Sequence, residues 1–374
     1  MVAGGSVAGL TFAAEAAKRG LDVVVLEEHS EFGEPEKCDG LVSLRGLRRY
    51  GYSPSPEVIQ SSVKEGVIHA PNAAVLEVNA TSLEVVVLDR SAYDKQLAER
   101  ALEWGAKLKP GVRANGVRET AEGVRVEGDE AYECIYYVDA TGPASSPRQG
   151  IIPAAKYEIE AGWITEGRVE VFVDQVKYPG FFAWVIPFGG GRAKVGAAGR
   201  GINTFKALDD FLSGRNYKIT RRVAAPIYVG GPAHGFLTGR RLHVGESAGQ
   251  VKPTTAGGVT TSLAAAVLAA RWVSDAITSK DPSVLKSYQA DWESRFGKEM
   301  QAMIRLRGVF EKLTNRDLDT LVSTLSKPKL TGKLSSSDFD FHATALLSAL
   351  GIVGLMRIAR LLASAEAKQL LQGF

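Results

Sequence analysis

The residues of this chain whose types could do chemistry are few. There are two cysteines, Cys38 and Cys134, and five histidines, and none of them shows the spacing of metal ligands. No Ser/His/Asp arrangement is evident either. Cys38 lies in the segment 36–43, which is too rich in glycine and charge for regular structure. A thiol in such a loop could donate a proton or shape a ligand site, although free cysteines are most often small core residues.

A glycine turn near the N-terminus is the clearest binding motif. The first forty residues read as a strand, a turn at Gly4, Ser6 and Gly9, an alanine-rich helix that stops at Gly20, and a second strand that ends at Glu27. Free amides at the helix start attract a pyrophosphate, and the carboxylate can accept hydrogen bonds from ribose hydroxyls. The motif predicts a dinucleotide-binding βαβ unit, with Ser6 in place of the usual middle glycine. A simple helix-packing turn is the alternative.

Two later segments have the same character. An apolar strand runs into the stretch from Asp139 to Gly142, and another strand enters a glycine-rich loop at 245–258 before a helix. A helix that begins at glycines directs free amides and the positive end of its dipole at whatever precedes it. A strand-ending turn and an ordinary capped helix are the respective alternatives. The candidate contacts in the two segments are Asp139, Gly142, Glu246, Gly249, Thr255, Gly257 and Gly258.

The composition excludes some classes of protein. A chain of 374 residues with 45% hydrophobic content can bury a large core and suggests two domains or one large composite. The formal net charge of +3 is too small to indicate a nucleic-acid partner. The longest apolar run, at 343–356, is shorter than the roughly 20 residues needed to cross a bilayer. We expect a cytoplasmic protein, with peripheral membrane contact left open.

The order of the elements predicts an α/β fold: a Rossmann-like nucleotide-binding domain, an inserted and mostly antiparallel β-sheet domain, and a C-terminal helical region. A hairpin tip is expected at 189–191, a helix over 204–212, and helices from 282 on that are broken by the polar stretch 326–340. The predicted boundaries are 1–62, 89–150 and 236–280 for the nucleotide-binding domain, 63–88 and 151–235 for the β-rich substrate domain, and 281–374 for the helical region.

Together these motifs resemble those of flavoproteins with the aromatic-hydroxylase fold. Among them the chain is most similar to the geranylgeranyl reductases, especially the archaeal enzymes that saturate prenyl chains of membrane lipids. The run from Lys37 to Gly40 is similar to that family's cysteine and glycine loop beside the flavin. The run from Tyr178 to Pro187 is similar to its aromatic strand, which ends in tryptophan, one residue, an apolar residue and proline. Glu246 stands where the family usually has aspartate.

The resemblance implies an FAD site and a substrate cavity. The implied FAD contacts are Gly4, Ser6, Gly9, Glu27, Cys38, Gly40, Arg90, Asp139, Gly142, Glu246, Gly249, Thr255, Gly257 and Gly258. Arg90 could equally be an exposed arginine at a helix start. Cys38 is hypothesised to help deliver a proton to an alkene or to shape the flavin face. Tyr178 and Trp184 are implied to line the cavity, with an ordinary core role as the alternative.

The implied function is that of an FAD-dependent oxidoreductase that saturates carbon–carbon double bonds of isoprenoid lipids in membrane-lipid biosynthesis. The electron donor stays open between NADPH and ferredoxin, because no second dinucleotide fingerprint is found. A flavin monooxygenase of the same fold and a non-catalytic prenyl-binding protein are the alternatives. The apolar run at 343–356, followed by Arg357 and Arg360, is expected to be a buried helix, with a lipid-tunnel cap or a membrane-surface helix as alternatives.

Overall fold

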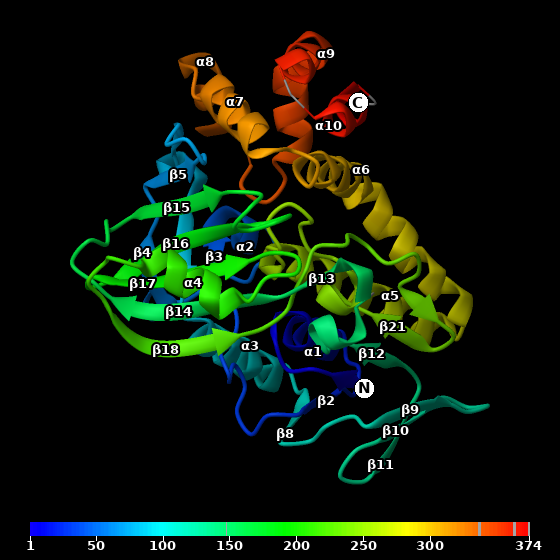
Figure 1. Ribbon diagram of the computed structural model, residues 1–374. Coiled ribbons are helices and arrows are strands. Elements are labelled where there is room, and N and C mark those ends of the chain that lie inside the picture. Colours follow the sequence, from blue (N-terminus) through cyan, green and yellow to red (C-terminus); the bar gives the residue numbers. More distant parts are fainter. Residues whose placement is uncertain (147, 336–337, 362–363, 373–374) are drawn as a thin grey trace.

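A six-stranded sheet carries the N-terminal glycine turn (Figure 1). The computed structural model describes every residue except 147, 336–337, 362–363 and 373–374. The strands of this sheet are β1 (Val2–Ala3), β2 (Val24–Glu27), β8 (Lys107–Pro110), β12 (Tyr137–Asp139), β20 (Leu237–Thr238) and β21 (Arg241–His243). Their order is β20-β21-β12-β1-β2-β8, and all neighbours are parallel except β20 and β21. The predicted α/β class with a Rossmann-like domain is confirmed.

Two alanine-rich helices, α1 (Val7–Lys18) and α5 (Val259–Ser279), pack against each other beside this sheet. Their contact is made by small, fully buried side chains such as Ala13 and Ala265, so the two backbones approach closely. Helix α3 (Arg90–Glu103) packs on α1 as well, and it begins at Asp89, whose side chain accepts a hydrogen bond from the amide of Ala92. The close packing places the N-termini of α1 and α5 beside the glycine turns.

A seven-stranded sheet forms the second layer. It contains β5 (Glu65–His69), β6 (Val75–Asn79), β14 (Ala154–Glu160), β15 (Arg168–Val173), β16 (Phe182–Gly189), β17 (Arg192–Ala198) and β18 (Lys218–Ala224). The order is β18-β14-β17-β16-β15-β5-β6, and only the pair of β5 and β15 is parallel. Helix α4 (Thr204–Leu212) covers one face (Figure 1). The predicted hairpin tip at 189–191 and helix over 204–212 are confirmed.

Short sheets connect the two layers, and one of them corrects a prediction. Segment 36–43 was expected to be irregular throughout, but Leu41–Ser43 forms β3, which pairs with β7 (Val85–Leu88). The partner lies far along the chain, so local composition could not reveal it. β7 also pairs with β4 (Ile59–Ser62), and helix α2 (Leu44–Arg49) follows β3. The domain boundaries given above stay a prediction.

The remaining strands are small. They are β9 (Gly116–Glu119), β10 (Val124–Glu127) and β11 (Ala131–Cys134), which form one sheet, and β13 (Ile151–Ile152) and β19 (Ile227–Tyr228), which form another. The three-stranded sheet projects from the nucleotide-binding part at the end opposite to the C-terminal helices (Figure 1).

The C-terminal region is helical. Its helices are α6 (Lys286–Phe310), α7 (Asn315–Leu325), α8 (Pro328–Ser335), α9 (Ala343–Leu361) and α10 (Ala365–Gln372). The polar stretch 326–340 was expected to interrupt the helices, but α8 lies within it and begins at a proline, which suits a first helical position. Helix α7 and helix α8 both pack on β6.

The apolar run at 343–356 lies in α9, which is kinked at Gly351, where φ is +62°. Ala343 and Leu355 are buried, whereas Met356 and Arg360 are exposed. The side chain of Arg357 lies outside the described part of the chain. Among the described residues, no helix is both long and apolar enough to span a membrane.

Candidate functional site

The turn between β1 and α1 has no room for side chains. A Cβ on Gly4, where φ is +101°, would lie 2.3 Å from the carbonyl oxygen of Ala140 at the end of β12. A Cβ on Gly9 would lie 1.9 Å from the carbonyl oxygen of Gly4. Glycine is therefore required at both positions, because the turn passes directly against the neighbouring strand and the helix packs directly on the turn.

The N-terminus of α1 is arranged as an anion site. Ser6 is the N-cap residue, yet in the described structure its side chain caps no amide of the helix. Its hydroxyl instead donates to Asp94 Oδ2 at 2.7 Å. The first turn contains only uncharged residues, so its amides and the positive end of the helix dipole are left for a ligand. The serine in place of the usual glycine thus turns its side chain away from the helix start.

Glu27 lies at the carboxyl end of β2, beside the glycine turn. Its Oε2 accepts from the amide of Gly5 at 2.6 Å, and its Oε1 accepts from the amide of His29 at 2.9 Å and lies 2.5 Å from Nδ1 of the same residue. A carboxylate has about four acceptor positions, so these contacts orient the group and leave capacity for a ribose hydroxyl. The ring of Phe32 packs against Gly5.

The two later glycine segments meet at the same end of the sheet. The Asp139 carboxylate accepts from the amide and the hydroxyl of Thr141, and the Asp139 carbonyl accepts from the Ser247 hydroxyl at 2.6 Å. Gly142 has φ of +75°, and a Cβ there would lie 3.8 Å from Glu246 Oε2. The structure therefore brings Asp139, Gly142 and Glu246 together, across more than a hundred residues of sequence.

Helix α5 begins like α1, without a side-chain cap. Its N-cap is Gly258, and its first turn, Val259 to Ser262, is uncharged. Just before it, Thr254 Oγ1 is buried without a hydrogen-bond partner among the described residues, and Thr255 is exposed. Gly249, where φ is +66°, packs against the carbonyl of Gly231. A polar ligand at this helix start would meet free amides and unsatisfied hydroxyls.

Sequence reasoning missed the groups that hold the loop before α5. Lys252 is buried and lies 3.2 Å from Asp340 Oδ1, and its side chain packs under Gly257. Arg307 of α6 donates to the carbonyl of Pro253 at 3.2 Å. The C-terminal region therefore fixes the shape of this loop, and only the run of glycines beside the lysine could have hinted at it.

Arg90 is buried, so its alternative as an exposed helix-start residue is wrong. Its guanidinium donates to Asp94 Oδ1 at 2.8 Å and reaches Ser6 Oγ at 3.4 Å. Burial works against its charge, but the Asp94 carboxylate and then the adjacent Cys38 thiol hold the pKa of Arg90 above its ordinary value. Arg90 therefore links the glycine turn to residues 36–40 around Cys38, which we call the cysteine loop.

Cys38 is exposed, two residues before Gly40, whose φ is +78°. A Cβ on Gly40 would lie 2.2 Å from the carbonyl oxygen of Leu88, so the loop presses closely on β7. Cys134, by contrast, lies in β11 and donates to the carbonyl of Val124. Only Cys38 is thus placed near the other candidate contacts.

Trp184 and Tyr178, which were expected to line one cavity, lie in different apolar clusters. Trp184 faces the nucleotide-binding part, where it packs with Phe181 and Ile186, and its cluster extends to Leu41 and Ala256. Its indole lies on Gly196, where a Cβ would be 2.1 Å from the ring. The face occupied by Trp184 therefore adjoins both the loop before α5 and the end of the cysteine loop.

Tyr178 packs in the cluster on the opposite face, with Tyr157 and Leu208. It borders a hollow of about 730 Å³ between β15 and α4. Burial raises the pKa of Tyr178 to about 12. The two aromatic residues therefore cannot line the same part of a cavity, and only Trp184 lies on the side of the glycine turns.

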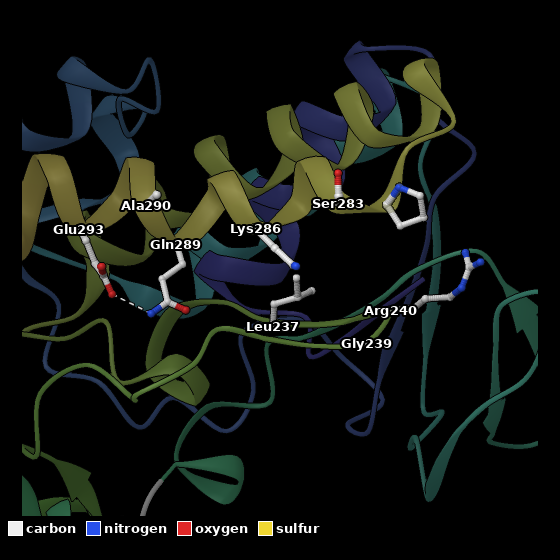
Figure 2. Close-up of a pocket in the computed structure, with 9 residues that line it drawn as sticks. Leu237, Gly239, Arg240, Ser283, Lys286, Gln289, Ala290 and Glu293 are labelled. Atoms are coloured by element: carbon white, nitrogen blue, oxygen red, sulfur yellow. Dashed lines mark hydrogen bonds between the residues drawn. The ribbon is translucent and has the colours of Figure 1, made fainter.

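A second hollow, of about 710 Å³, lies between α6 and the β20–β21 hairpin (Figure 2). Figure 2 shows Lys286 of α6 reaching toward Leu237, with Gln289 and Glu293 farther along the same helix and Arg240 on the other side of the hollow. Gln289 Nε2 donates to Glu293 Oε1 at 2.7 Å, and Gln289 Oε1 accepts from the amide of Phe236. This hollow is bordered by none of the predicted site residues.

Glu246 provides a pH-dependent prediction. Burial raises the pKa of its carboxyl from 4.5 to about 7. Between these two pH values the carboxyl of Glu246 is protonated in the folded, FAD-free protein and ionised in the unfolded chain. The stability that comes from the neutral buried carboxyl is therefore complete below pH 4.5 and is lost as the pH rises through 7. The loss amounts to at most about 3 kcal/mol, because the side chain keeps some exposure. Urea unfolding between pH 4.5 and 8 should show Glu246→Gln losing less stability than the unmutated protein; parallel curves would contradict the assignment.

Comparisons with known proteins first give the class. A model of the NAD(P)-binding Rossmann-like domain matches residues 2–34. A geranylgeranyl bacteriochlorophyll reductase-like protein from Thermoplasma acidophilum superposes with a TM-score of 0.85 at 23% identity, covering 93% of this chain and 94% of that one. A variant of a flavin-dependent brominase superposes with a TM-score of 0.69 at 13% identity, covering 92% and 94%. The fold is thus shared with flavin-dependent oxidoreductases.

Sequence similarity then gives the family. Digeranylgeranylglycerophospholipid reductase 2 of Methanopyrus kandleri is 30% identical over 361 residues, which cover 87% of this chain and 90% of the relative. The protein of that name from Methanothermobacter thermautotrophicus is 30% identical over 357 residues, covering 88% and 92%. This chain therefore belongs to the digeranylgeranylglycerophospholipid reductase family. The resemblance inferred from the motifs is confirmed.

Proposed function

We propose that this protein is an FAD-dependent reductase that saturates carbon–carbon double bonds in the isoprenoid chains of membrane lipids. The observation that carries the proposal is that two uncapped helix starts, those of α1 and α5, lie close together, and that the apolar cluster of β16 reaches Ala256, just before α5. The names of the two reductase relatives supply the substrate class. The fit of the FAD site supports the cofactor, since glycines stand wherever a Cβ would block the turns.

The hydrogen-bond donors and acceptors of the site indicate which group of the protein would hold which part of FAD. The amides of α1 would hold the pyrophosphate, Glu27 the ribose, and Asp139 and Glu246 the hydroxyl groups of the ribityl chain. The start of α5, with Thr255, would face the polar edge of the ring. FAD supplies hydride chemistry to the site when it is bound and reduced.

The protein's own contribution is to hold an apolar chain and to supply a proton. Phe181, Trp184 and Ile186 belong to a buried apolar cluster that reaches the loop before α5 at Ala256. An isoprenoid chain packed there would be shielded from water. Cys38 is the proposed proton donor or flavin-shaping residue, because its thiol is exposed and its carbonyl accepts from Lys156, which is on the same sheet face as Trp184. Tyr178, on the opposite face, is given no part in this proposal.

The proposal extends to two partners. The electron donor is either NADPH or a ferredoxin. Peripheral contact with a membrane surface is supported by the need to take a lipid substrate from a bilayer. It is also supported by the exposed Met356 and Arg360, one turn apart on α9, and by the exposed Leu370 of α10.

Mass spectrometry of isoprenoid lipids incubated with the protein, FAD and dithionite tests the function. We expect the purified protein to be yellow and the lipids to gain two hydrogens for each reduced bond. A product that instead gains an oxygen atom under air with NADPH would identify a monooxygenase. A colourless protein that binds prenyl lipids without changing them would identify a non-catalytic binding protein.

A further inference from the structure

Two lysines of the seven-stranded sheet are almost completely buried. Lys156 of β14 has 3% of its surface exposed and Lys194 of β17 has 1%. Lysine is almost never buried to this degree without a partner for its charge. Both side chains lie on the sheet face that carries Trp184: Lys156 pairs with Gly196, and Gly196 pairs with Trp184 on the next strand. The lysines therefore point toward the candidate site.

Their partners all belong to the cysteine loop. Lys194 Nζ lies 2.6 Å from Glu36 Oε1 and donates to the carbonyl of Asp39 at 3.2 Å. Lys156 Nζ donates to the carbonyl of Cys38 at 2.9 Å and lies 3.2 Å from Asp39 Oδ1. The loop that carries the thiol is thus held by its backbone as well as by its charges.

Arg221 of β18 completes the arrangement. It lies 3.3 Å from Glu36 Oε2, donates to the Glu36 carbonyl at 3.1 Å, and also contacts Glu158 at 3.4 Å. Burial alone would raise the pKa of Glu36, but Lys194, followed by Lys156 and Arg221, holds it below the ordinary value. We call Lys156, Lys194 and Arg221, together with Glu36 and Asp39, the lysine clamp.

The lysine clamp binds the cysteine loop to the seven-stranded sheet, although this loop follows β2 of the six-stranded, nucleotide-binding sheet. On its other side the thiol adjoins Arg90, which is linked through Asp94 to the Ser6 hydroxyl. Cys38 therefore sits between two buried charge networks, one from each layer. Such an arrangement fixes the distance between the thiol and the face of Trp184.

We propose that Lys156 and Lys194 are positioning residues, which hold Cys38 in register with the aromatic face where the substrate is reduced. This inference rests on the proposed function for its catalytic consequence. Its structural content, the placement of the thiol, can be measured without any substrate. The ordinary alternative is that the clamp only adds stability to the fold.

The test compares Lys156→Met with Lys206→Met. Lys206 is an exposed lysine of α4 that forms an ion pair with Asp210 at 2.6 Å and touches no residue of the clamp, so it controls for the loss of a lysine charge. Lys156→Met should lower kcat for alkene reduction by about tenfold or more, with KM and FAD affinity little changed, because a displaced reacting group costs rate more than binding. Lys156→Arg should restore part of the rate, and Lys206→Met should leave it intact.

The second measurement is the rate of alkylation of Cys38 by iodoacetamide, followed by peptide mass spectrometry over a range of pH. Lys156→Met should change this rate and its pH profile severalfold, and Lys206→Met should not. If Lys156→Met does not fold, Asp39→Asn breaks the same ion pair from the other side and should also change the alkylation rate severalfold. An unchanged profile together with unchanged kcat overturns the proposal, as does a loss of kcat that merely follows a loss of FAD.

The kinetic and the alkylation measurements distinguish a failure of this proposal from a failure of the proposed function. If the unmutated protein reduces no isoprenoid lipid, the reductase assignment fails, yet the alkylation profiles still decide whether the clamp places the thiol.

Discussion

Replacing Gly4 by alanine is expected to yield a protein that purifies without FAD. The new Cβ would lie 2.3 Å from the carbonyl oxygen of Ala140, at a φ of +101° that alanine rarely adopts. The turn must move away from β12, and backbone strain of this kind costs about 1–3 kcal/mol before any contact to the ligand is lost. We expect FAD affinity to fall by about 100-fold or more, which corresponds to about 3 kcal/mol, measured by flavin fluorescence titration.

Gly20→Ala provides a matched control. Gly20 has a φ of +82°, close to that of Gly4, but no heavy atom lies within 4 Å of the position of its Cβ. This variant carries the same kind of backbone strain without the collision, so it should lose about 1 kcal/mol of stability and keep its FAD. Equal loss of FAD in both variants would mean that general destabilisation, and not the closeness of the turn to β12, governs binding.

The nucleotide-binding layer could be predicted from the sequence because its signals are local. Gly4 and Gly9 belong to the residue spacing of one strand–turn–helix unit, although the contact that requires glycine at position 4 is with the distant Ala140. The hairpin at 189–191 and the helix over 204–212 have their own turn and periodicity signals. The same holds for the start of α5, where a run of glycines precedes an apolar helix. Such features depend little on the rest of the fold.

The clamp and the loop contacts could not be predicted, because their partners are distant in sequence. Lys156 and Cys38 are separated by 118 residues, and Lys194 and Glu36 by 158. A lysine within a strand ordinarily indicates a solvated position, so the residue type alone does not point to the burial of these two lysines. These lysines meet Cys38 and Glu36 only in the folded protein, where the seven-stranded sheet packs against the loop that follows β2.

Tyr178 and Trp184 lie in different apolar clusters for a geometric reason. The alternation of side chains applies only within a strand, and β16 begins at Phe182. Tyr178 precedes it in a turn that includes Gly180, where φ is +73°. Counting alternate positions back from Trp184 across that turn therefore does not give the face on which Tyr178 lies. The burial of Arg90 could not be read from the sequence either, because it depends on the packing of α3 against α1. Asp94, one helical turn later, pairs with Arg90 on the side that packs against α1.

Replacing Trp184 by leucine should separate a substrate-contacting residue from an ordinary core residue. Trp184 has 9% of its surface exposed, and its cluster reaches both Leu41, just after the cysteine loop, and Ala256 of the loop before α5. Removing the indole should cost about 2–4 kcal/mol of stability. It should also lower kcat/KM for alkene reduction by about tenfold or more, because the chain loses the surface that holds it against the site.

Trp292→Leu is the control for the loss of a buried indole. Trp292 of α6 is 1% exposed, packs edge-to-face with Phe236, and, like Trp184, has an indole nitrogen without a hydrogen-bond partner among the described residues. Both variants should therefore lose a similar amount of stability in urea unfolding. Turnover, measured at a low temperature where both are folded and normalised to bound FAD, should fall only in Trp184→Leu. If the two variants keep the same turnover, Trp184 is a core residue and the substrate must lie on another surface.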